Sequence, residues 1–316
     1  MSNLKLVIGF IVYGESTAKY LPKFLTSLQE AVDQLDLDLT WLCYNNGPTN
    51  FQSNLDELKR WSQIVVLGDG KNIGFARAYN QLIDRARDNG ADYFLALNPD
   101  LLLDADAVRE LLVVLTVNPQ ISAVSPKVRR WNFDTNERTA LIDTCGIIIK
   151  PGLQFSDLGQ GERDQGQYDS AEIAGPSGCA ALWRLSALAQ IKDEQGYFDQ
   201  RIFMYKEDCD LAYRWQQAGL KAVLAPQALI YHDRSAEAEG VSLWRRFINQ
   251  RRKSKNIRHW SYFAQWLIFF KHWSSLSARD KLMVVYYASL NLTYALIFDR
   301  SLLKEIKRAK LITHNS

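Results

Sequence analysis

The chain has 316 residues, of which 47% are hydrophobic and 23% charged, a composition typical of a folded protein and not of a disordered one. Its length suggests one large domain with an appendage, or two domains. The formal net charge of +3 is unevenly spread, because residues 241–316 carry a net charge of +12 and the remainder carries −9. A basic C-terminal region on an acidic body indicates an anionic surface as the partner of that region.

Cysteine usage and the first residues indicate a reducing compartment. Cys43, Cys145, Cys179 and Cys209 are scattered, without the CxxC or CxxH spacing of zinc sites. They are predicted to be free thiols that behave as small hydrophobic residues. Residues 1–3 lead into an apolar run without the charged segment or cleavage site of a secretory signal, so we expect a cytoplasmic protein.

Strands and helices are predicted to alternate through the first 126 residues. Apolar runs predict strands over residues 4–12, 39–44, 64–67 and 121–126, and helical periodicity predicts helices over 18–35, 56–61 and 104–115. Residues 13–16 are predicted to form a loop, and a glycine-bearing loop at 70–75 opens a helix ending near residue 88. Such alternation favours right-handed crossovers and a mostly parallel sheet. Neither GxGxxG nor GxxxxGK[ST] is present, which excludes the dinucleotide and P-loop fingerprints.

Residues 93–100 are the centre of the sequence pattern. An apolar run predicts a fully buried strand over 93–97, which Asn98-Pro99-Asp100 ends because proline cannot donate to a ladder. Asn98 and Asp100 therefore follow the carboxyl end of a strand, the edge where open α/β sheets bind ligands. A carboxylate there is suited to hold a divalent cation against a diphosphate. Taken alone, the tripeptide also fits a simple turn.

The second half of the chain offers acidic and small residues. Residues 131–170 are glycine-rich and polar and are predicted to be a long insert that shapes a binding site. Small residues around Gly178 would let the backbone approach a ligand closely, although a bare turn fits them equally. Glu207 and Asp208 fall in the first turn of a helix ending near Gly219, where acids also suit the helix dipole. A short strand at 221–224 is followed by His232, for which a plain polar strand end is the alternative to metal ligation.

These motifs, taken in order, resemble family 2 glycosyltransferases. They are Asn72-Ile73-Gly74-Phe75-Ala76-Arg77-Ala78-Tyr79-Asn80, Asn98-Pro99-Asp100, Glu207-Asp208-Cys209-Asp210-Leu211 and Tyr231-His232. The match is closest to the bacterial rhamnosyltransferase-like branch and covers roughly the first 235 residues. The resemblance implies the GT-A fold, a Rossmann-like, mostly parallel sheet flanked by helices. It also implies an inverting reaction, in which a base deprotonates the acceptor hydroxyl that attacks the sugar of a nucleotide donor.

The resemblance also assigns roles to individual residues. Asp208 matches the catalytic base, Asp100 the ligand of Mg²⁺ or Mn²⁺, and His232 a further metal ligand. The nucleotide-sugar site would comprise Tyr13, Asn45, Asn72, Gly74, Arg77, Asn98 and Asp100, and the acceptor or donor loop would comprise Gly178 and Glu207. Two positions depart from the family pattern: Asn98 replaces the first acid of Asp-x-Asp, and Asn45 replaces the usual Asp that reads uracil or thymine.

The C-terminal region combines basic and aromatic residues. Residues 243–258 are dominated by Arg and Lys, residues 260–273 are aromatic, and residues 282–298 form an uncharged run of 17. A spanning helix needs about 20 apolar residues, so this run favours helices lying in the membrane interface. The alternative is a soluble helical subdomain whose aromatic residues pack on the catalytic body. Nucleic acid is excluded as a partner, since no RNP, helix-turn-helix or zinc motif is present.

The sequence therefore predicts a GT-A catalytic domain over 1–240 and a helical, membrane-associating region over 241–316. Within the first, residues 1–130 would bind the nucleotide sugar and 131–240 the acceptor. We expect a metal-dependent inverting enzyme at the inner face of the cell membrane. It would transfer L-rhamnose from dTDP-rhamnose to a lipid-linked glycan in surface polysaccharide (O antigen) synthesis. A hexosyltransferase with a UDP-sugar donor and an inactive GT-A scaffold are the alternatives.

Overall fold

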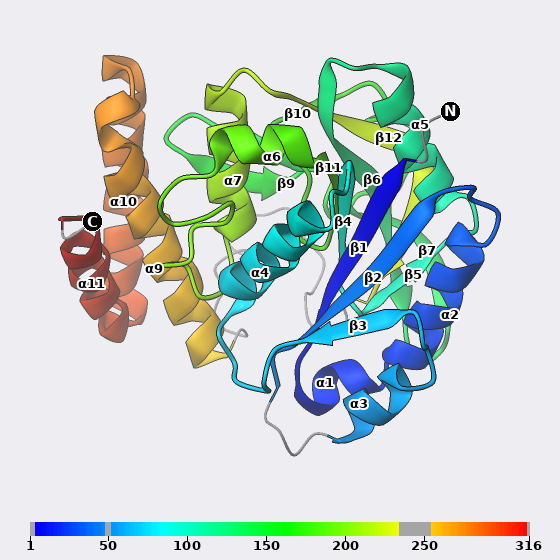
Figure 1. Ribbon diagram of the computed structural model, residues 1–316. Helices are drawn as coiled ribbons and strands as arrows, with labels where there is room; N and C mark the ends of the chain where they lie inside the picture. Colours follow the sequence, from blue (N-terminus) through cyan, green and yellow to red (C-terminus); the bar gives the residue numbers. More distant parts are fainter. Residues whose placement is uncertain (1–3, 48–51, 234–253, 315–316) are drawn as a thin grey trace.

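The computed structural model describes residues 4–47, 52–233 and 254–314. These residues form an α/β body with a group of helices along one side (Figure 1). The strands are β1 (Lys5–Val12), β2 (Asp38–Asn45), β3 (Ile64–Leu67), β4 (Tyr93–Leu97), β5 (Leu101–Leu103), β6 (Ile121–Asn132), β7 (Glu137–Thr144), β8 (Ile147–Lys150), β9 (Gln154–Asp157), β10 (Glu172–Ile173), β11 (Ala180–Arg184) and β12 (Lys221–His232). The helices of the body are α1 (Gly14–Ala18), α2 (Leu21–Val32), α3 (Gln52–Leu58), α4 (Phe75–Asp88), α5 (Ala107–Val117), α6 (Leu185–Ile191) and α7 (Glu207–Gln217).

A ten-stranded sheet organises the body, in the order β10-β12-β6-β11-β4-β1-β2-β3, with β5 paired to β12 and β7 to β6. Strands β3, β2, β1 and β4 run parallel to one another, and β12 runs parallel to β6. Strand β11 lies antiparallel between β4 and β6. Because the central strands are parallel, the carboxyl ends of β1, β2 and β4 meet at one edge of the sheet. The predicted α/β fold with a mostly parallel central sheet is confirmed.

Two apolar layers cover the faces of this sheet. Helices α2 and α5 pack on one face through the leucine and phenylalanine positions that give α2 its helical period. Helices α4, α6 and α7 cover the other face, with Tyr79 and Trp215 fully buried against it. Strand β4 is buried along its whole length between the two layers, as its continuous apolar run predicts. The sheet edge beyond β4 is therefore held in a rigid frame.

Several predicted boundaries are wrong. Residues 14–18 form helix α1 instead of a loop, and α3 begins and ends earlier than the predicted 56–61. The polar insert at 131–170 contains β7, which pairs antiparallel with β6, and the β8–β9 hairpin. The predicted short strand at 221–224 is the start of the 12-residue β12, which passes through an irregularity between Ala225 and Leu229. Pro226 lies in that irregularity, where a missing backbone donor is tolerated.

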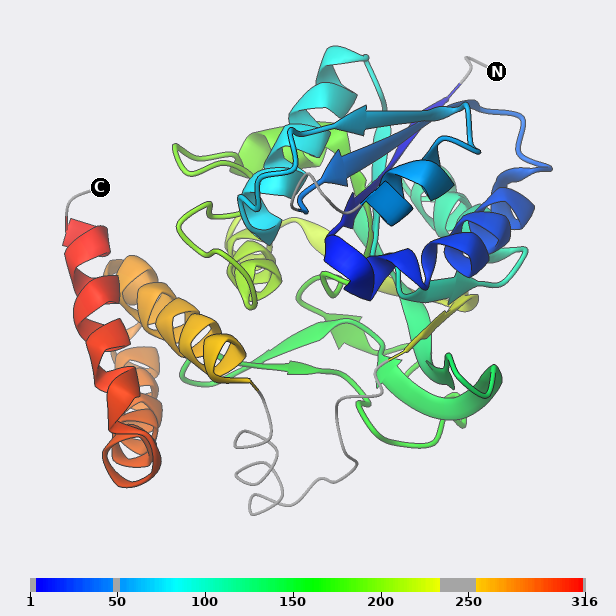
Figure 2. The same ribbon diagram turned by 90° about the horizontal axis from the view of Figure 1, so that it is seen from below.

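The C-terminal helices are α9 (Lys255–His272), α10 (Ala278–Phe298) and α11 (Leu303–His314), with single turns at Trp273–Ser275 and Arg300–Leu302. They pack side by side, and α9 faces the body (Figures 1 and 2). The aromatic side chains of α9 are buried or half-buried, whereas most apolar side chains of α10 are exposed. Most of the basic stretch at 243–258 lies outside the described residues. Helix α10 is long and apolar enough to cross a membrane by length and composition, and it is mostly unburied.

Candidate active site

The carboxyl edge of the parallel strands gathers the polar residues that follow β1, β2 and β4. Val12 and Asn45 are paired in register, so Tyr13 and Asn45 leave the sheet side by side. A Cβ on Gly47 would lie 2.9 Å from the backbone nitrogen of Gly14, which shows how closely the two chain segments approach. Asn98 follows β4 at the same edge, and its N–H donates to the carbonyl of Cys179 at 2.8 Å.

The loop before α4 closes one side of this edge. Asn72 Oδ1 accepts a hydrogen bond from the N–H of Gly74 at 3.0 Å. Gly74 has a φ of +86°, and a Cβ there would lie 2.5 Å from the carbonyl oxygen of Phe203. That carbonyl accepts the N–H of Phe75, the first residue of α4, at 2.8 Å. Glycine is therefore required at residue 74, and Arg77 lies exposed in the first turn of the helix.

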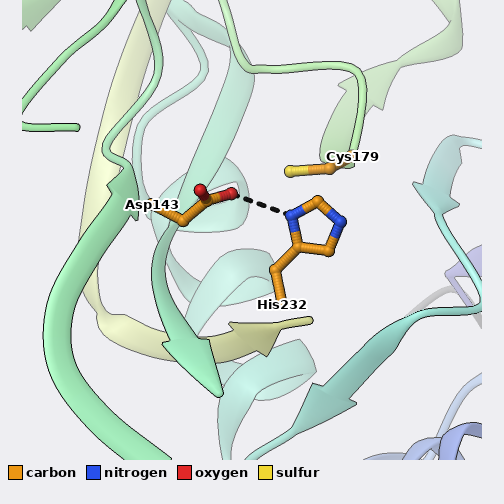
Figure 3. Close-up of side chains that lie close together, drawn as sticks. All are labelled: Asp143, Cys179 and His232. Atoms are coloured by element: carbon orange, nitrogen blue, oxygen red, sulfur yellow. Dashed lines mark hydrogen bonds and ion pairs between the residues drawn. The ribbon is translucent and has the colours of Figure 1, made fainter. Parts of the chain in front are cut away.

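Asp100 and His232 meet although 132 positions separate them in the sequence. Strand β12 pairs with β5 so that His232 lies opposite Leu101, and His232 Nε2 is 3.3 Å from Asp100 Oδ1. The other ring nitrogen, Nδ1, is 2.8 Å from Asp143 Oδ2. Figure 3 shows this contact and the sulfur of Cys179 beside the ring. The imidazole thus lies between two carboxylates.

The charges in this cluster support one another. Burial disfavours the charged imidazole, but Asp100 and Asp143 outweigh that effect and raise the pKa of His232 to about 10. Burial likewise opposes ionisation of Asp100, yet the charge of His232 lowers the pKa of that carboxyl below its usual value. Asp100 is consequently ionised at neutral pH and turned toward the ring.

The donor atoms here fit a divalent cation. Asp100 Oδ1 is buried, and among the described residues its contact with His232 Nε2 at 3.3 Å does not have the geometry of a hydrogen bond, while a third of the side chain is exposed. A carboxylate oxygen and an imidazole nitrogen are ligands that Mg²⁺ or Mn²⁺ accepts, and a cation bound here would displace the proton from Nε2 of His232. Asp143, Cys179 and His232 also place one ligand atom each within 4.8 Å of one another. The sequence did not single out Asp143 and Cys179 as site residues. Only the pairing of β6 with β7, β11 and β12 brings Asp143, on β7, and Cys179, just before β11, to His232.

Asp208 lies in the first turn of α7, and the backbone orients its carboxylate. Oδ2 accepts the N–H of Gly178 at 2.9 Å, and Oδ1 accepts the N–H of Cys209 at 2.8 Å. A Cβ on Gly178 would lie 3.2 Å from Oδ2, so a small residue is needed at that position. Each carboxylate oxygen keeps a second lone pair, and the side chain is half-buried. The group can therefore accept a proton from a hydroxyl that approaches it.

Gly178 and its neighbour connect the two carboxylates. Gly178 donates to Asp208, and the carbonyl of Cys179 accepts the N–H of Asn98, two residues before Asp100. Two consecutive residues thus bridge α7 to the end of β4. Glu207 differs from Asp208, because it is 5% exposed and its Oε2 has no hydrogen-bond partner within the described parts of the chain. Burial, and then the charge of Asp208, raise the pKa of Glu207 well above its usual value.

Comparisons with known proteins agree with this geometry. A sequence profile of glycosyl transferase family 2 matches residues 8–191, more than half of the chain. The chain belongs to glycosyl transferase family 2. A second profile, glycosyl transferase family group 2, matches residues 165–303. The resemblance drawn from the motifs is therefore confirmed.

Relatives of this glycosyltransferase include a rhamnosyltransferase. The N-acetylglucosaminyl-diphospho-decaprenol L-rhamnosyltransferase of Mycobacterium tuberculosis is 25% identical over 256 residues, which cover 72% of this chain and 76% of the relative. Similar solved structures include GalNAc-T7 with UDP, GalNAc and Mn²⁺ (TM-score 0.59, 10% identity, 85% of this chain and 48% of that one). This chain thus spans about half of GalNAc-T7. Another is a mannosyltransferase of Pyrobaculum calidifontis with GDP-Man and Mn²⁺ (TM-score 0.52, 15% identity, 99% and 87% coverage). These likenesses show the GT-A glycosyltransferase fold.

Proposed function

We propose that this family 2 glycosyltransferase is an inverting enzyme that transfers L-rhamnose from dTDP-rhamnose to a lipid-linked sugar in surface polysaccharide synthesis. The observation that carries the reaction type is the carboxylate of Asp208, oriented by two backbone N–H groups and bridged through Gly178 and Cys179 to the Asp100 edge. The rhamnosyl donor and the lipid-linked acceptor are supported by the named activity of the mycobacterial relative. A UDP-hexose donor is the alternative that the first experiment below distinguishes.

The proposed reaction is a single displacement. Asp208 takes the proton of the acceptor hydroxyl as its oxygen attacks the anomeric carbon of the donor sugar. The bond between that carbon and the diphosphate oxygen breaks, and the nucleoside diphosphate leaves with the electron pair. Attack from the face opposite the leaving group inverts the configuration of the sugar. One carboxylate with a free lone pair is sufficient for this role.

Asp100 and His232 are the residues that would hold the divalent cation. A bound Mg²⁺ or Mn²⁺ would neutralise charge that develops on the departing diphosphate. Asp143 would act through its hydrogen bond to Nδ1 of His232, which orients the ring and leaves Nε2 directed at Asp100. We assign the rest of the donor site to two groups of residues. The sugar and diphosphate would contact Asn98, Asn72 and the N-terminus of α4, and the nucleotide base would contact Tyr13 and Asn45.

A thermal-shift screen tests the donor and the cation. A ligand that binds only the native state raises its melting temperature. We expect dTDP-rhamnose with Mn²⁺ or Mg²⁺ to stabilise the wild-type protein and to lose this effect in Asp100→Ala. Stabilisation by UDP-hexoses alone would replace the rhamnosyl assignment. No stabilisation by any nucleotide sugar at millimolar concentration would overturn the enzyme proposal in favour of a scaffold.

We also propose that the C-terminal helices attach the enzyme to an anionic membrane surface. Helix α10 exposes an apolar face with no charged position between Lys281 and Asp299, and the region carries a net charge of +12. The exposed apolar residues are Leu282, Val285, Tyr286, Leu290, Leu292, Leu296, Ile297 and Phe298. The positive charge suits acidic lipid headgroups, and the exposed apolar side chains suit the boundary between the headgroups and the acyl chains.

Vesicle binding by full-length variants tests this attachment. Leu282 and Ile297 are 69% and 66% exposed, so Leu282→Gln with Ile297→Gln would remove apolar contact without disturbing the fold. We expect binding to phosphatidylglycerol vesicles to fall at least about tenfold. Val117→Gln is the matched control, because Val117 is 78% exposed on α5 of the catalytic body. Equal binding by all three proteins would contradict the proposal.

A further inference from the structure

The loop that delivers Asp208 has an unusual backbone. Tyr205 and Lys206, two consecutive residues with side chains, have φ values of +69° and +68°. L-residues rarely adopt this left-handed conformation, and it persists only where surrounding contacts hold it. Lys206 is the N-cap of α7, so Glu207 and Asp208 follow it directly. The direction of the Asp208 side chain therefore depends on whatever holds this loop.

One side chain of α9 holds it. Gln265 is 3% exposed, and its Oε1 accepts a hydrogen bond from Lys206 Nζ at 2.6 Å. Its Nε2 donates to the carbonyl oxygen of Leu153 at 3.1 Å, and Leu153 has a φ of +53°. One buried amide thus bridges two left-handed residues, one in the β8–β9 turn and one at the start of α7. Because both polar atoms of this buried amide are hydrogen-bonded, the amide fixes the relative positions of the two segments that it joins.

The end of α9 holds α7 itself. Asp210, which is fully buried two positions after Asp208, accepts Lys271 Nζ at 2.9 Å and His272 Nε2 at 2.7 Å. Lys271 Nζ also donates to Asp199 Oδ2 at 2.8 Å, at the beginning of the loop. Buried charges of this kind are costly unless paired, so α9 and α7 cannot separate freely. The loop is thus held from α9 at its start, at its end and in the first turn of α7.

The same loop also contacts the start of α4, the side of the site that we assign to the donor. The carbonyl of Phe203 accepts the N–H of Phe75 at the start of α4, beside Gly74. The ring of Phe203 packs on Trp260 of α9, with centroids 5.1 Å apart. One loop therefore contacts the nucleotide-side helix, the helix that bears the base, and α9.

We propose that α9 is a positioning element of the active site, with Gln265 setting the backbone conformation that aims Asp208 at the acceptor. The inference rests on the proposed role of Asp208 as base. It makes the C-terminal helices part of the catalytic unit and not a separable anchor. Gln265 acts through Lys206 and touches no substrate, so its loss lowers turnover and leaves donor binding intact.

Steady-state kinetics of full-length variants test this role. Gln265→Met removes both hydrogen bonds at similar volume, and we expect kcat to fall roughly tenfold or more while KM for the donor stays within about twofold. Tyr262→Phe is the matched control on the same helix, because the Tyr262 hydroxyl donates to the carbonyl of Asn291 in α10 and not to the loop. We expect its melting temperature to fall while kcat is kept. If kcat falls in both variants in proportion to the loss of melting temperature, Gln265 has only a structural role and the inference is wrong.

Lys206→Met supplies a second route if Gln265→Met folds poorly. Both single variants break the same hydrogen bond, so the double variant should lose no more kcat than the worse single one. Additive losses would overturn the inference. Hydrogen–deuterium exchange of residues 199–206 gives a readout independent of activity, and Gln265→Met should speed it. Faster exchange in a protein without transferase activity would identify failure of the proposed function, whereas unchanged exchange would overturn the positioning role itself.

Discussion

At the residue scale, the two adjacent acids of α7 have different surroundings. Asp208 is half-buried and accepts two backbone N–H groups, whereas Glu207 is buried with one carboxyl oxygen lacking a partner among the described residues. The sequence pattern proposes Asp208 as the base and Glu207 as a loop residue. Only the structure supplies the reason that the pair divides in this way, since both residues suit a helix N-terminus equally.

Glu207→Gln tests this division through stability. Burial raises the pKa of Glu207, so the native state keeps a proton that an unfolded glutamic acid loses above a pKa of about 4.3. Wild-type stability therefore carries a cost that grows with pH above about 4, with a slope approaching 1.4 kcal/mol per pH unit. We expect the variant to gain stability relative to the wild type from pH 4 to 7 in urea unfolding. A difference that does not change with pH would contradict an uncharged Glu207.

At the element scale, β4 and α4 are predictable from the sequence and the loop before α7 is not. The continuous apolar run of β4 predicts a buried strand and the apolar periodicity of α4 predicts a helix, and both form in the structure. The left-handed pair Tyr205 and Lys206 has no such signal, because contacts from α9 and not local preference hold it. Asp143 could not be predicted as a site residue for the same reason, because strand pairing and not local sequence brings it next to His232.

Gly74 offers a prediction at this scale, with Gly90 as a matched control. Both glycines have a positive φ, but a Cβ at Gly74 would meet the carbonyl of Phe203 at 2.5 Å and a Cβ at Gly90 would meet nothing within 4 Å. We expect Gly90→Ala to cost about 1–2 kcal/mol from its backbone conformation alone. Gly74→Ala should cost more and also abolish the donor-dependent thermal shift. Equal effects in chemical unfolding and in donor binding would contradict the close approach of the two loops.

At the scale of the whole molecule, the C-terminal helices complete the catalytic body. Phe263, Leu267 and Phe269 of α9 share an apolar cluster with Ile202 and Tyr213 of the body. The sequence left open whether these aromatic residues face a membrane or the body, since composition alone cannot choose between two apolar environments. In the structure the aromatic face of α9 turns to the body, while the face of α10 stays exposed.

A chain ending at residue 240 should therefore fold poorly. It would expose the apolar cluster and leave Asp199 and Asp210 without Lys271. Asp199 keeps Arg201 and Asp210 keeps Arg214, so each buried carboxylate loses part of its pairing, and this loss adds to that of the apolar burial against a total stability of about 5–15 kcal/mol. We expect aggregation, or a strongly lowered melting temperature, by size-exclusion chromatography and calorimetry. A monomer with wild-type stability would contradict the dependence of the body on α9.

Turnover by Asp208→Asn is the most direct test of the central claim. Sugar transfer from the donor identified by the thermal-shift screen would be followed to the proposed lipid-linked sugar acceptor, with donor binding measured on the same samples. General-base catalysis typically contributes roughly 10²–10⁴-fold, so we predict that kcat falls by about this factor while the donor-dependent shift in melting temperature is kept. Transfer at the wild-type rate by Asp208→Asn would contradict the account, because the proton of the acceptor would then leave by another group.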